Sequence, residues 1–308
     1  MRAGQLSVTV RAPAKVNLSL VVGRPREDGF HPLDTVYQAI SLYDDVTVSA
    51  ADEWSVSVTP IGDVDCLGVP LDESNIAVRA GRLLADHHGL DRAATIRIAK
   101  GIPVAGGLAG GSADAAATLV ALDRLWDAGT TDDDLLHLAG QLGSDVPFAL
   151  IGGTAHGTGR GEVVEPLTDA GTYWWVVVPA HEGLSTPSVY AEFDRLHPDL
   201  PVGVHHDEPP GLLHALEGGD ALVVAQWLRN DLQTPALSLR PELGDRLTLV
   251  EQQGAVAALL SGSGPTVLGL AADQDEAREL RLALTESGQV TVHVAAGPVA
   301  GAHVVEYV

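Results

Sequence analysis

The amino-acid sequence predicts an α+β protein built from two domains, and three observations carry this prediction. The chain has 308 residues, which is too long for one comfortable core but suits two domains of ordinary size. Hydrophobic residues make up 45% of the chain and charged residues 19%, so burial is ample and global disorder is disfavoured. Segments with strand and helix patterns occur in both halves, and a new buried strand begins near Tyr173. We therefore expect domains at 1–168 and 169–308.

The N-terminal half should open with a long, half-buried strand, because apolar and polar residues alternate from Leu6 to Val22. A helix capped by Ser74 should run to about His87 and end at Gly89, the residue type that most often terminates helices. The other elements expected here are a hairpin of strands at 46–49 and 55–59, a strand at 94–99, an Ala-rich helix from about 112 to 126 and a helix capped by Thr131.

The C-terminal half repeats this mixture of strands and helices. A Gly/Ser turn at 261–264 separates two apolar segments that should form strands. The Pro-, Gly- and His-rich segment 198–210 is expected to be a loop. The remaining expected elements are strands at 173–178, 256–260, 265–270, 290–294 and 303–307 and helices at 188–196, 221–228, 241–253 and 275–285.

Charge and composition exclude several classes of protein. The formal net charge is -23, which argues against binding nucleic acid or an anionic membrane. The chain holds no apolar run long enough to cross a bilayer, and its N-terminus lacks a signal-peptide core. The single cysteine, Cys66, rules out an internal disulfide framework or a Cys-based zinc cluster. We expect a cytoplasmic protein, with any nucleotide chemistry confined to a cleft in which the few cations gather.

A glycine-rich loop at 103–111 is the main chemical signal. It leads directly into the expected helix near Ser112, and glycine lets the backbone approach a ligand closely. Free N–H groups at the start of a helix add partial positive charge, so the segment could hold phosphate groups. It is not a Walker A loop, in which lysine is followed by serine or threonine, because Lys15 is followed by valine and Lys100 by glycine. It is not a Rossmann loop either, because that loop follows the first strand and this one comes after several strands. A flexible turn that allows tight helix packing is the alternative.

Three further segments carry weaker signals. Lys15 and Asn17 are two residues apart on one strand and should share a face, although lysine is also common on exposed strand edges. Asp145 precedes Val-Pro after a helix end, where a carboxylate could accept a proton from a hydroxyl or simply cap a turn. The 261–264 turn could close over phosphates or be a plain hairpin turn. Lys15 and Lys100 are the only two lysines of the chain.

The order of these segments resembles the GHMP kinases, a family that includes galactokinase and the homoserine, mevalonate and phosphomevalonate kinases. Its three motifs are an N-terminal strand segment, a P-x-x-x-G-L loop entering a helix, and a C-terminal Gly/Ser turn. Pro103, Gly107 and Leu108 fit the middle motif, and the three motifs together span most of the chain. The resemblance implies a two-domain GHMP-kinase fold, with a ribosomal-protein-S5-like N-terminal domain and a ferredoxin-like C-terminal domain.

Within this family, four segments resemble the branch that acts on a cytidine diphosphate substrate: APAKVNL, EDGFHPL, GSDVPF and AGGSADAA. The resemblance implies ATP-dependent phosphorylation of the 2-hydroxyl of a diphosphocytidyl methylerythritol, a step of non-mevalonate isoprenoid precursor biosynthesis. Phe30 would stack on the cytosine and His31 would bond to it, which are the two contacts that base recognition requires. A core aromatic beside a solvated histidine is the alternative. The predicted substrate residues are Asn17, Phe30, His31, Thr186 and Tyr190.

The resemblance also assigns catalytic and nucleotide-binding residues. Lys15 would stabilise charge at the transferring phosphoryl group, and Asp145 would orient the hydroxyl and accept its proton. Mg²⁺ should bridge phosphate oxygens, with Ser112 as a candidate ligand. The predicted ATP-binding residues are Asn75, Lys100, Pro103, Val104, Ala105, Gly106, Gly107, Leu108, Ala109, Gly110, Gly111 and Ser112.

The chain departs from the family pattern at three points. Ala105 and Ala109 replace glycines of the loop, and because alanine tolerates the usual φ < 0 regions we expect it to adopt them here and the loop to survive. Phe30 replaces a more frequent tyrosine and keeps the stacking face. The glutamate that helps to hold magnesium in other branches has no counterpart that we can place.

Two other readings of the function stay open. One is a different GHMP enzyme, such as a mevalonate- or homoserine-type kinase or a diphosphomevalonate decarboxylase. The other is a non-enzymatic binding protein, since the N-terminal domain would share its fold with a ribosomal protein, although the charge of -23 conflicts with RNA binding. We expect a small-molecule substrate, no nucleic acid or membrane partner, and a monomer or homodimer.

Overall fold

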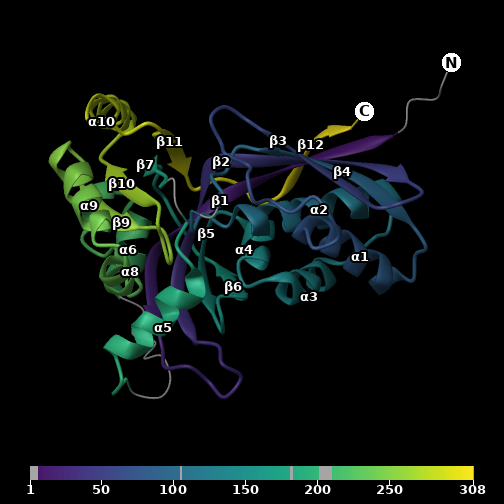
Figure 1. Cartoon of the computed structure of the whole chain (residues 1–308), viewed down its shortest axis with the longest axis horizontal. Helices are drawn as coiled ribbons and strands as arrows, with labels where there is room; N and C mark the ends of the chain where they lie inside the picture. The colour runs from purple at the N-terminus through teal and green to yellow at the C-terminus, as the bar shows by residue number, and fades with distance from the viewer. Residues whose placement is uncertain (1–5, 105, 181–182, 201–209, 308) are drawn as a thin grey trace.

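The structure is a computed structural model that describes residues 6–104, 106–180, 183–200 and 210–307. Figure 1 shows two sheets with helices packed against each. The larger sheet contains the strands β1 (Ser7–Val22), β2 (Leu33–Ala51), β3 (Ser55–Pro60), β4 (Ala93–Lys100), β5 (Thr154–Thr158), β6 (Val163–Pro166), β8 (Arg229–Asn230) and β12 (His303–Tyr307). The smaller sheet contains β7 (Tyr173–Val178), β9 (Ala257–Leu260), β10 (Val267–Ala271) and β11 (His293–Gly297), in the order β11-β7-β10-β9. This mixture of helices and largely antiparallel sheets confirms the predicted α+β class.

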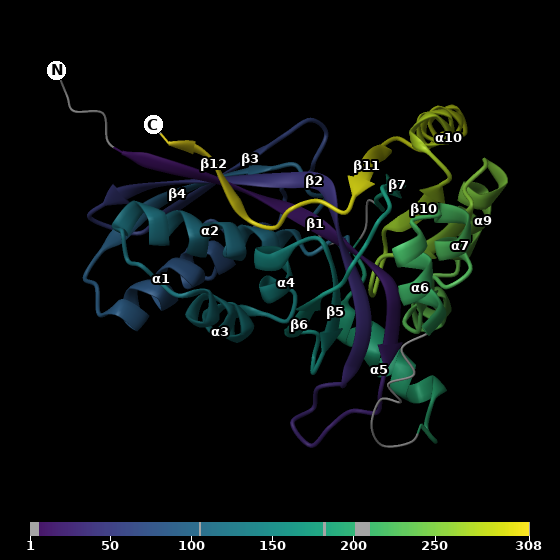
Figure 2. The ribbon, with the colours of Figure 1, turned by 180° about the vertical axis from the view of Figure 1, so that it is seen from behind.

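Four helices lie on one side of the larger sheet, as Figures 1 and 2 both show: α1 (Ile76–His88), α2 (Gly110–Trp126), α3 (Asp132–Leu142) and α4 (Val146–Ile151). Helix α2 is central, and its run of alanines is almost entirely buried. Small side chains let this helix approach the strands closely, so the glycine-rich loop at its start is held against the sheet. The other helices are α5 (Thr186–Leu196), α6 (Pro210–Gly218), α7 (Ala221–Ala225), α8 (Gln233–Leu239), α9 (Glu242–Gln252) and α10 (Gln274–Glu286).

The long strands β1 and β2 form an antiparallel pair that extends through both parts of the molecule. Along its other edge, β1 pairs with β12 at residues 8–11 and with β8 at residues 19–20. Between these two pairings, the backbone N–H of Lys15 donates to the carbonyl of Leu108 over 3.2 Å. The glycine-rich loop is therefore attached directly to the edge of the strand that carries Lys15.

Several predicted elements differ from the structure. The hairpin predicted at 46–49 and 55–59 is wrong, because β4 lies between β2 and β3 and pairs in parallel with β3. Helix α1 is capped by the side chain of Asn75, which accepts from the N–H of Ala77, and not by Ser74. The strand at 303–307 exists but pairs with β1 in the N-terminal sheet. The boundary near residue 168 falls between β6 and β7 and stays a prediction.

The apolar side chains form two main cores, and each takes residues from both halves of the chain. One core packs α1, α2 and α4 under the larger sheet and includes Leu18, Ile96 and Leu119. A second core packs α5, α8, α9 and α10 against the smaller sheet. Trp175 of β7 belongs to the first core, and its indole N–H donates to Gln38 of β2 over 3.0 Å. The two sheets are thus joined by buried contacts between β2 and β7.

Candidate active site

A cavity of about 960 Å³ brings together segments that are far apart in the sequence. Its walls come from β1, the loop before β2, the 103–111 loop, the start of α4, helix α5 and the 262–263 turn. Most of the predicted site residues line it: Lys15, Asn17, Phe30, His31, Asn75, Lys100, Pro103, Val104, Gly106, Gly107, Leu108, Ala109, Gly110, Gly111, Asp145, Thr186 and Tyr190. Ser112 is not among the described residues that line it, and Ala105 lies outside the described part of the chain.

Lys15 and Asn17 share one face of β1, as their spacing predicts. The ammonium of Lys15 donates to Oδ1 of Asn17 over 2.8 Å, and the amide of Asn17 donates to the hydroxyl of Thr35 on β2. Lys15 is only 7% exposed. A buried ammonium needs polar partners, and Asn17 supplies one while Thr35 fixes the orientation of Asn17. The lysine is therefore held in place at the cavity wall and is not an exposed edge residue.

Asp145 completes this group of polar side chains. It occupies the cap position of α4, yet its carboxylate makes no capping bond to that helix. One oxygen, Oδ2, lies 3.7 Å from Nζ of Lys15, and the other, Oδ1, accepts from the hydroxyl of Tyr37 over 3.2 Å. Tyr37 is buried, and burial together with the neighbouring Asp145 raises the pKa of its hydroxyl well above the usual value. Tyr37 thus stays a neutral donor to the carboxylate.

Gly107 is a position of the glycine-rich loop that requires glycine. Gly107 has φ +78°, and a Cβ added there would lie 2.1 Å from the backbone oxygen of Ser261. The hydroxyl of Ser261 donates to the carbonyl of Gly107 over 3.0 Å. The 261–264 turn therefore closes over the loop from the C-terminal half of the chain.

Ala109 differs from expectation. It lies in the left-handed region, with φ +58°, although we expected alanine to keep negative φ in this loop. That expectation was wrong because Ala109 is the cap residue at which the chain turns into α2, and this turn needs a positive φ here. The helix accordingly begins at Gly110, two residues before the predicted start at Ser112. Gly110 and Gly111 both lie in its first turn and line the cavity.

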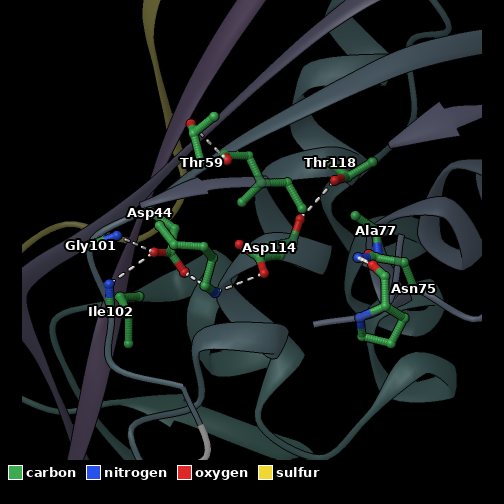
Figure 3. A network of polar contacts seen from close by, with 11 residues as sticks. Asp44, Thr59, Asn75, Ala77, Gly101, Ile102, Asp114 and Thr118 are labelled. Atoms are coloured by element: carbon green, nitrogen blue, oxygen red, sulfur yellow. Dashed lines mark hydrogen bonds and ion pairs between the residues drawn. The ribbon is translucent and has the colours of Figure 1, made fainter. Parts of the chain in front are cut away.

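Lys100 lines the cavity, but its ammonium is fixed between two carboxylates. It contacts Oδ2 of Asp44 at 2.6 Å and Oδ2 of Asp114 at 2.9 Å, a network drawn in Figure 3. The other oxygen of Asp44 accepts from the N–H groups of Gly101 and Ile102, so this carboxylate holds the entry to the glycine-rich loop. Lys100 therefore supports the loop indirectly, through its contact with Asp44.

The three charges of this network perturb one another. Burial raises the pKa of Asp114 well above its usual value, against the opposing influence of Lys100. Burial would lower the pKa of Lys100, but the two carboxylates together outweigh it and the pKa is raised. Oδ1 of Asp114 is buried and has no hydrogen-bond partner among the described residues. The network is thus a buried cluster of ionisable groups in which Oδ1 of Asp114 has no partner among the described residues.

Asn75 is buried beside the cavity and already has two bonds. Its side-chain oxygen caps α1, and its amide donates to the carbonyl of Pro70 over 2.7 Å. It therefore fixes the segment before α1, of which Gly68, Val69 and Pro70 also line the cavity.

Aromatic residues gather at the other end of the cavity. The rings of His31 and Tyr190 lie 4.8 Å apart between centroids, and Nδ1 of His31 donates to the carbonyl of Gly23 over 2.8 Å. Phe30 is 49% exposed rather than tucked into the core. Asp194, one turn beyond Tyr190 on α5, lies 3.6 Å from Nε2 of His31. These groups provide flat apolar faces beside polar edges, which is the environment that a nucleobase requires.

Thr186, also predicted to contact the substrate, begins α5 at the cavity edge. Its hydroxyl lies 2.8 Å from that of Ser263. The bond joins α5 to the 261–264 turn, so the aromatic end and the glycine-rich loop are connected through one short chain of contacts.

The residues of this cavity or its support that sequence reasoning missed include Tyr37, Asp44, Asp114 and Arg160. Tyr37 lies in the first part of β2, whose residues are buried on both faces and show no alternation that would mark a strand. Asp44 lies further along the same strand. Asp114 falls in the AGGSADAA segment but gave no sign of pairing with Lys100. The two glycines that flank Arg160 were the only available signal of its turn.

In the described part of the chain, no three His, Cys, Asp or Glu residues come close enough together to hold a metal ion. No helix among the described residues combines the length and the apolar character needed to cross a membrane.

Comparison with known proteins assigns the class that this fold and site define. The family model of the GHMP kinases N terminal domain matches residues 75–153, and that of the GHMP kinases C terminal matches residues 212–290. The chain belongs to the GHMP kinase family.

Its relatives are more specific. A 4-diphosphocytidyl-2-C-methyl-D-erythritol kinase of Nocardioides sp. is 58% identical over 97% of this chain and 100% of that protein. The enzyme of the same name from Thermobifida fusca is 53% identical over 97% of this chain and 98% of that protein.

Solved structures of GHMP kinases are also similar to this chain. A crystal structure of 4-(cytidine 5'-diphospho)-2C-methyl-D-erythritol kinase is similar with a TM-score of 0.75 at 33% identity, covering 95% of this chain and 100% of that chain. A homoserine kinase from Cytophaga hutchinsonii, at 21% identity and a TM-score of 0.73, covers 99% of both chains and shows the fold alone.

Proposed function

We propose that this kinase transfers the γ-phosphoryl group of ATP to the 2-hydroxyl of 4-diphosphocytidyl-2-C-methyl-D-erythritol, in the cytoplasm, as a step of non-mevalonate isoprenoid precursor biosynthesis. One observation carries the proposal: a single cavity holds the glycine-rich loop, the Lys15–Asp145 pair and an aromatic end suited to cytosine. A GHMP enzyme acting on mevalonate or homoserine has no base to bind and would gain nothing from that aromatic end. The names of the relatives support the same substrate.

The triphosphate of ATP binds at the loop 106–111 and the first turn of α2. Backbone N–H groups at a helix start and its partial positive charge favour anions, and the glycines allow close approach. The Ser261–Gly107 bond holds the loop in this shape before ATP arrives. Preorganisation of this kind matters because phosphoryl transfer depends chiefly on alignment and charge stabilisation.

The acceptor hydroxyl lies between Lys15 and Asp145. Lys15 stabilises the negative charge of the transferring group, and Asp145 orients the hydroxyl and accepts its proton late in the reaction. A carboxylate is a weak base for an alcohol, so orientation is the larger part of its contribution. Tyr37 supports this function, because its bond to Oδ1 leaves Oδ2 directed towards Lys15.

Mg²⁺ would be held mainly by the phosphate oxygens of ATP, and its charge would neutralise them during transfer. A carboxylate and a hydroxyl near the glycine-rich loop fit Mg²⁺, which needs few protein ligands and retains waters. Asp145 and the hydroxyl of Ser112 are the candidate ligands, although Ser112 would have to reach the ion from outside the described cavity wall.

The test is an ADP-release assay with three acceptors: 4-diphosphocytidyl-2-C-methyl-D-erythritol, mevalonate and homoserine. We expect turnover above background only with the diphosphocytidyl compound. Thermal shift with ATP–Mg²⁺ and with CMP, separately and together, provides an independent readout, because two ligands bound at separate places stabilise the fold additively. Turnover of mevalonate or homoserine in place of the diphosphocytidyl compound would refute the proposal, and stabilisation by neither ligand would favour a binding protein of another kind.

A further inference from the structure

Arg160 stands in the cavity wall without a role in the chemistry described above. It lies in the turn between β5 and β6, flanked by Gly159 and Gly161, which have φ +71° and +101°. Its guanidinium carbon lies 4.7 Å from the centroid of the Phe30 ring. The arginine side chain is 29% exposed, so its charge remains accessible from the cavity.

The turn that bears Arg160 extends from the aromatic end of the cavity to the reacting end. At one side, the guanidinium covers Phe30. At the other, Gly161 packs so closely on Tyr37 that an added Cβ would lie 2.2 Å from its hydroxyl oxygen. That hydroxyl is the donor to Asp145. Arg160 therefore lies along the cavity between the place for a base and the place for the acceptor hydroxyl.

The positively charged side chains that line the cavity are held in place to different extents. Of the described residues that line it, three are lysine or arginine: Lys15, Lys100 and Arg160. Lys100 is fixed between two carboxylates at 2.6 and 2.9 Å. Lys15 is fixed by Asn17 and lies beside Asp145.

Arg160 is held more loosely. Its Nε lies 3.5 Å from Glu162, and its Nη2 lies 3.4 Å from the carbonyl of Gly140. These separations exceed those of strong charge-assisted bonds, so the guanidinium can turn towards an incoming anion at small cost.

The cavity is surrounded by negative charge, which a cation would offset when an anionic substrate binds. Asp114, Asp145 and Asp194 all line it, and the whole chain has a net charge of -23. A substrate with a diphosphate between its base and its alcohol would be repelled unless a positive group met that diphosphate. A guanidinium offers a planar pair of N–H donors that matches two phosphate oxygens at once.

We propose that Arg160 binds the diphosphate of the acceptor substrate and so makes the enzyme select a cytidine diphosphate derivative over a cytidine compound without phosphates. This inference rests on the proposed function. It makes Arg160 a substrate-binding residue that sets specificity through KM and leaves the phosphoryl-transfer step to Lys15 and Asp145.

The first measurement is steady-state ADP release by the wild-type enzyme, by Arg160→Gln and by Arg160→Lys. Arg160→Gln should raise KM for the diphosphocytidyl substrate by about 10- to 100-fold, as expected for loss of a charge-assisted contact, while kcat and KM for ATP change by less than about threefold. Arg160→Lys should recover part of the affinity, since it keeps the charge but loses the planar pair of donors.

The second measurement is calorimetric titration with CDP and with cytidine, in the presence of saturating ADP. Arg160→Gln should weaken CDP binding by about 10-fold or more and leave cytidine binding within about twofold of wild type. Arg195→Gln is the matched control: it removes the same charge from an exposed position on α5, where Arg195 pairs with Glu192, and should change neither ligand's affinity.

The outcomes separate the two proposals. If the wild-type enzyme does not phosphorylate the diphosphocytidyl substrate, the proposed function fails. If the wild-type enzyme is active and Arg160→Gln keeps its KM, only the assignment of Arg160 fails. Equal losses for cytidine and CDP would also overturn that assignment, because the arginine would then act by supporting Phe30, and so would a fall in kcat at constant KM.

Discussion

The hydroxyl of Tyr37 donates to Oδ1 of Asp145 over 3.2 Å, and this bond leaves the other carboxylate oxygen for Lys15. Tyr37 is itself clamped, because its ring stacks on Phe148 with centroids 4.8 Å apart. A group fixed by packing can fix a neighbour with little loss of entropy when the substrate binds. The carboxylate is thus aligned before the acceptor hydroxyl arrives.

Tyr37→Phe should lower kcat about 3- to 10-fold with KM nearly unchanged, because one hydrogen bond that orients Asp145 is lost and the ring packing is kept. Tyr43→Phe, on the same strand but beside Arg11 and outside the cavity lining, should leave kcat unchanged. Steady-state ADP release measures both variants. Wild-type kcat in Tyr37→Phe would show that Asp145 needs no such support.

Lys15→Ala and Asp145→Asn should each reduce kcat by about 10²- to 10⁴-fold, since each removes a group placed at the reacting atoms. Both variants should remain folded by circular dichroism. Asp127→Asn, at the far end of α2, makes the same chemical change outside the cavity lining and should keep wild-type kcat. Near wild-type turnover in either site variant would remove that residue from the mechanism.

Gly107→Ala should destabilise the fold by about 2 kcal/mol or more and raise KM for ATP, because the new Cβ would collide with the backbone oxygen of Ser261. The matched control is Gly62→Ala, which also has a positive φ, +61°, but meets nothing within 4 Å. It should cost only about 1 kcal/mol, the strain of the backbone angle alone. Urea unfolding compares the two variants, and equal losses would show that the contact with Ser261 contributes nothing.

Ala109→Gly should raise the free energy of unfolding by up to about 1 kcal/mol, because glycine adopts φ +58° without the strain that alanine incurs. Ala283→Gly, inside α10, is the control with the opposite sign and should cost about 1 kcal/mol. Thermal and urea unfolding give the comparison. Loss of stability in both variants would mean that alanine is not strained at position 109.

Asp114→Asn should change how stability depends on pH. Burial raises the pKa of Asp114, so the folded chain binds this proton more tightly than the unfolded chain. The contribution of the carboxyl to the free energy of unfolding therefore falls as pH rises above its unfolded pKa, near 3.8, towards the folded value. Relative to wild type, Asp114→Asn should therefore gain stability as pH rises above about 3.8.

Asp72→Asn supplies the control of opposite sign. Bonds from Ser74 lower the pKa of Asp72, so its contribution is present above the unfolded pKa and is lost as pH falls. The Asp72 variant should accordingly lose stability relative to wild type, or stay level, as pH rises. Urea unfolding at several pH values tests both, and parallel curves for wild type and Asp114→Asn would contradict the raised pKa.

Much of the cavity could be predicted because its signals are local. A two-residue spacing on a strand put Lys15 and Asn17 on one face, and glycines before a helix marked the loop. Asp145 could be found for the same reason, since its segment has a characteristic order of residues. Its partner Tyr37 could not, because it lies on β2, where burial of both faces removed the alternation of polar and apolar residues.

Pairing between distant segments was the harder part. Nothing in the sequence near Ser55 shows that β4 inserts beside β3, and nothing near His303 shows that β12 joins β1. These choices depend on which surfaces are left to cover once the sheet has formed. Ala109 is the corresponding case for backbone angles, because its positive φ is imposed by the entry into α2 and not by its own preference.

The pairing of β12 with β1 has a consequence for synthesis of the chain. Residues 8–11 of β1 pair with β2 on one edge, but their other edge is covered only after residues 303–307 have been made. Until then that stretch of backbone is open to pairing with another chain. Chains that stop before His303 would therefore present an unpaired strand edge, which β12 covers in the folded protein.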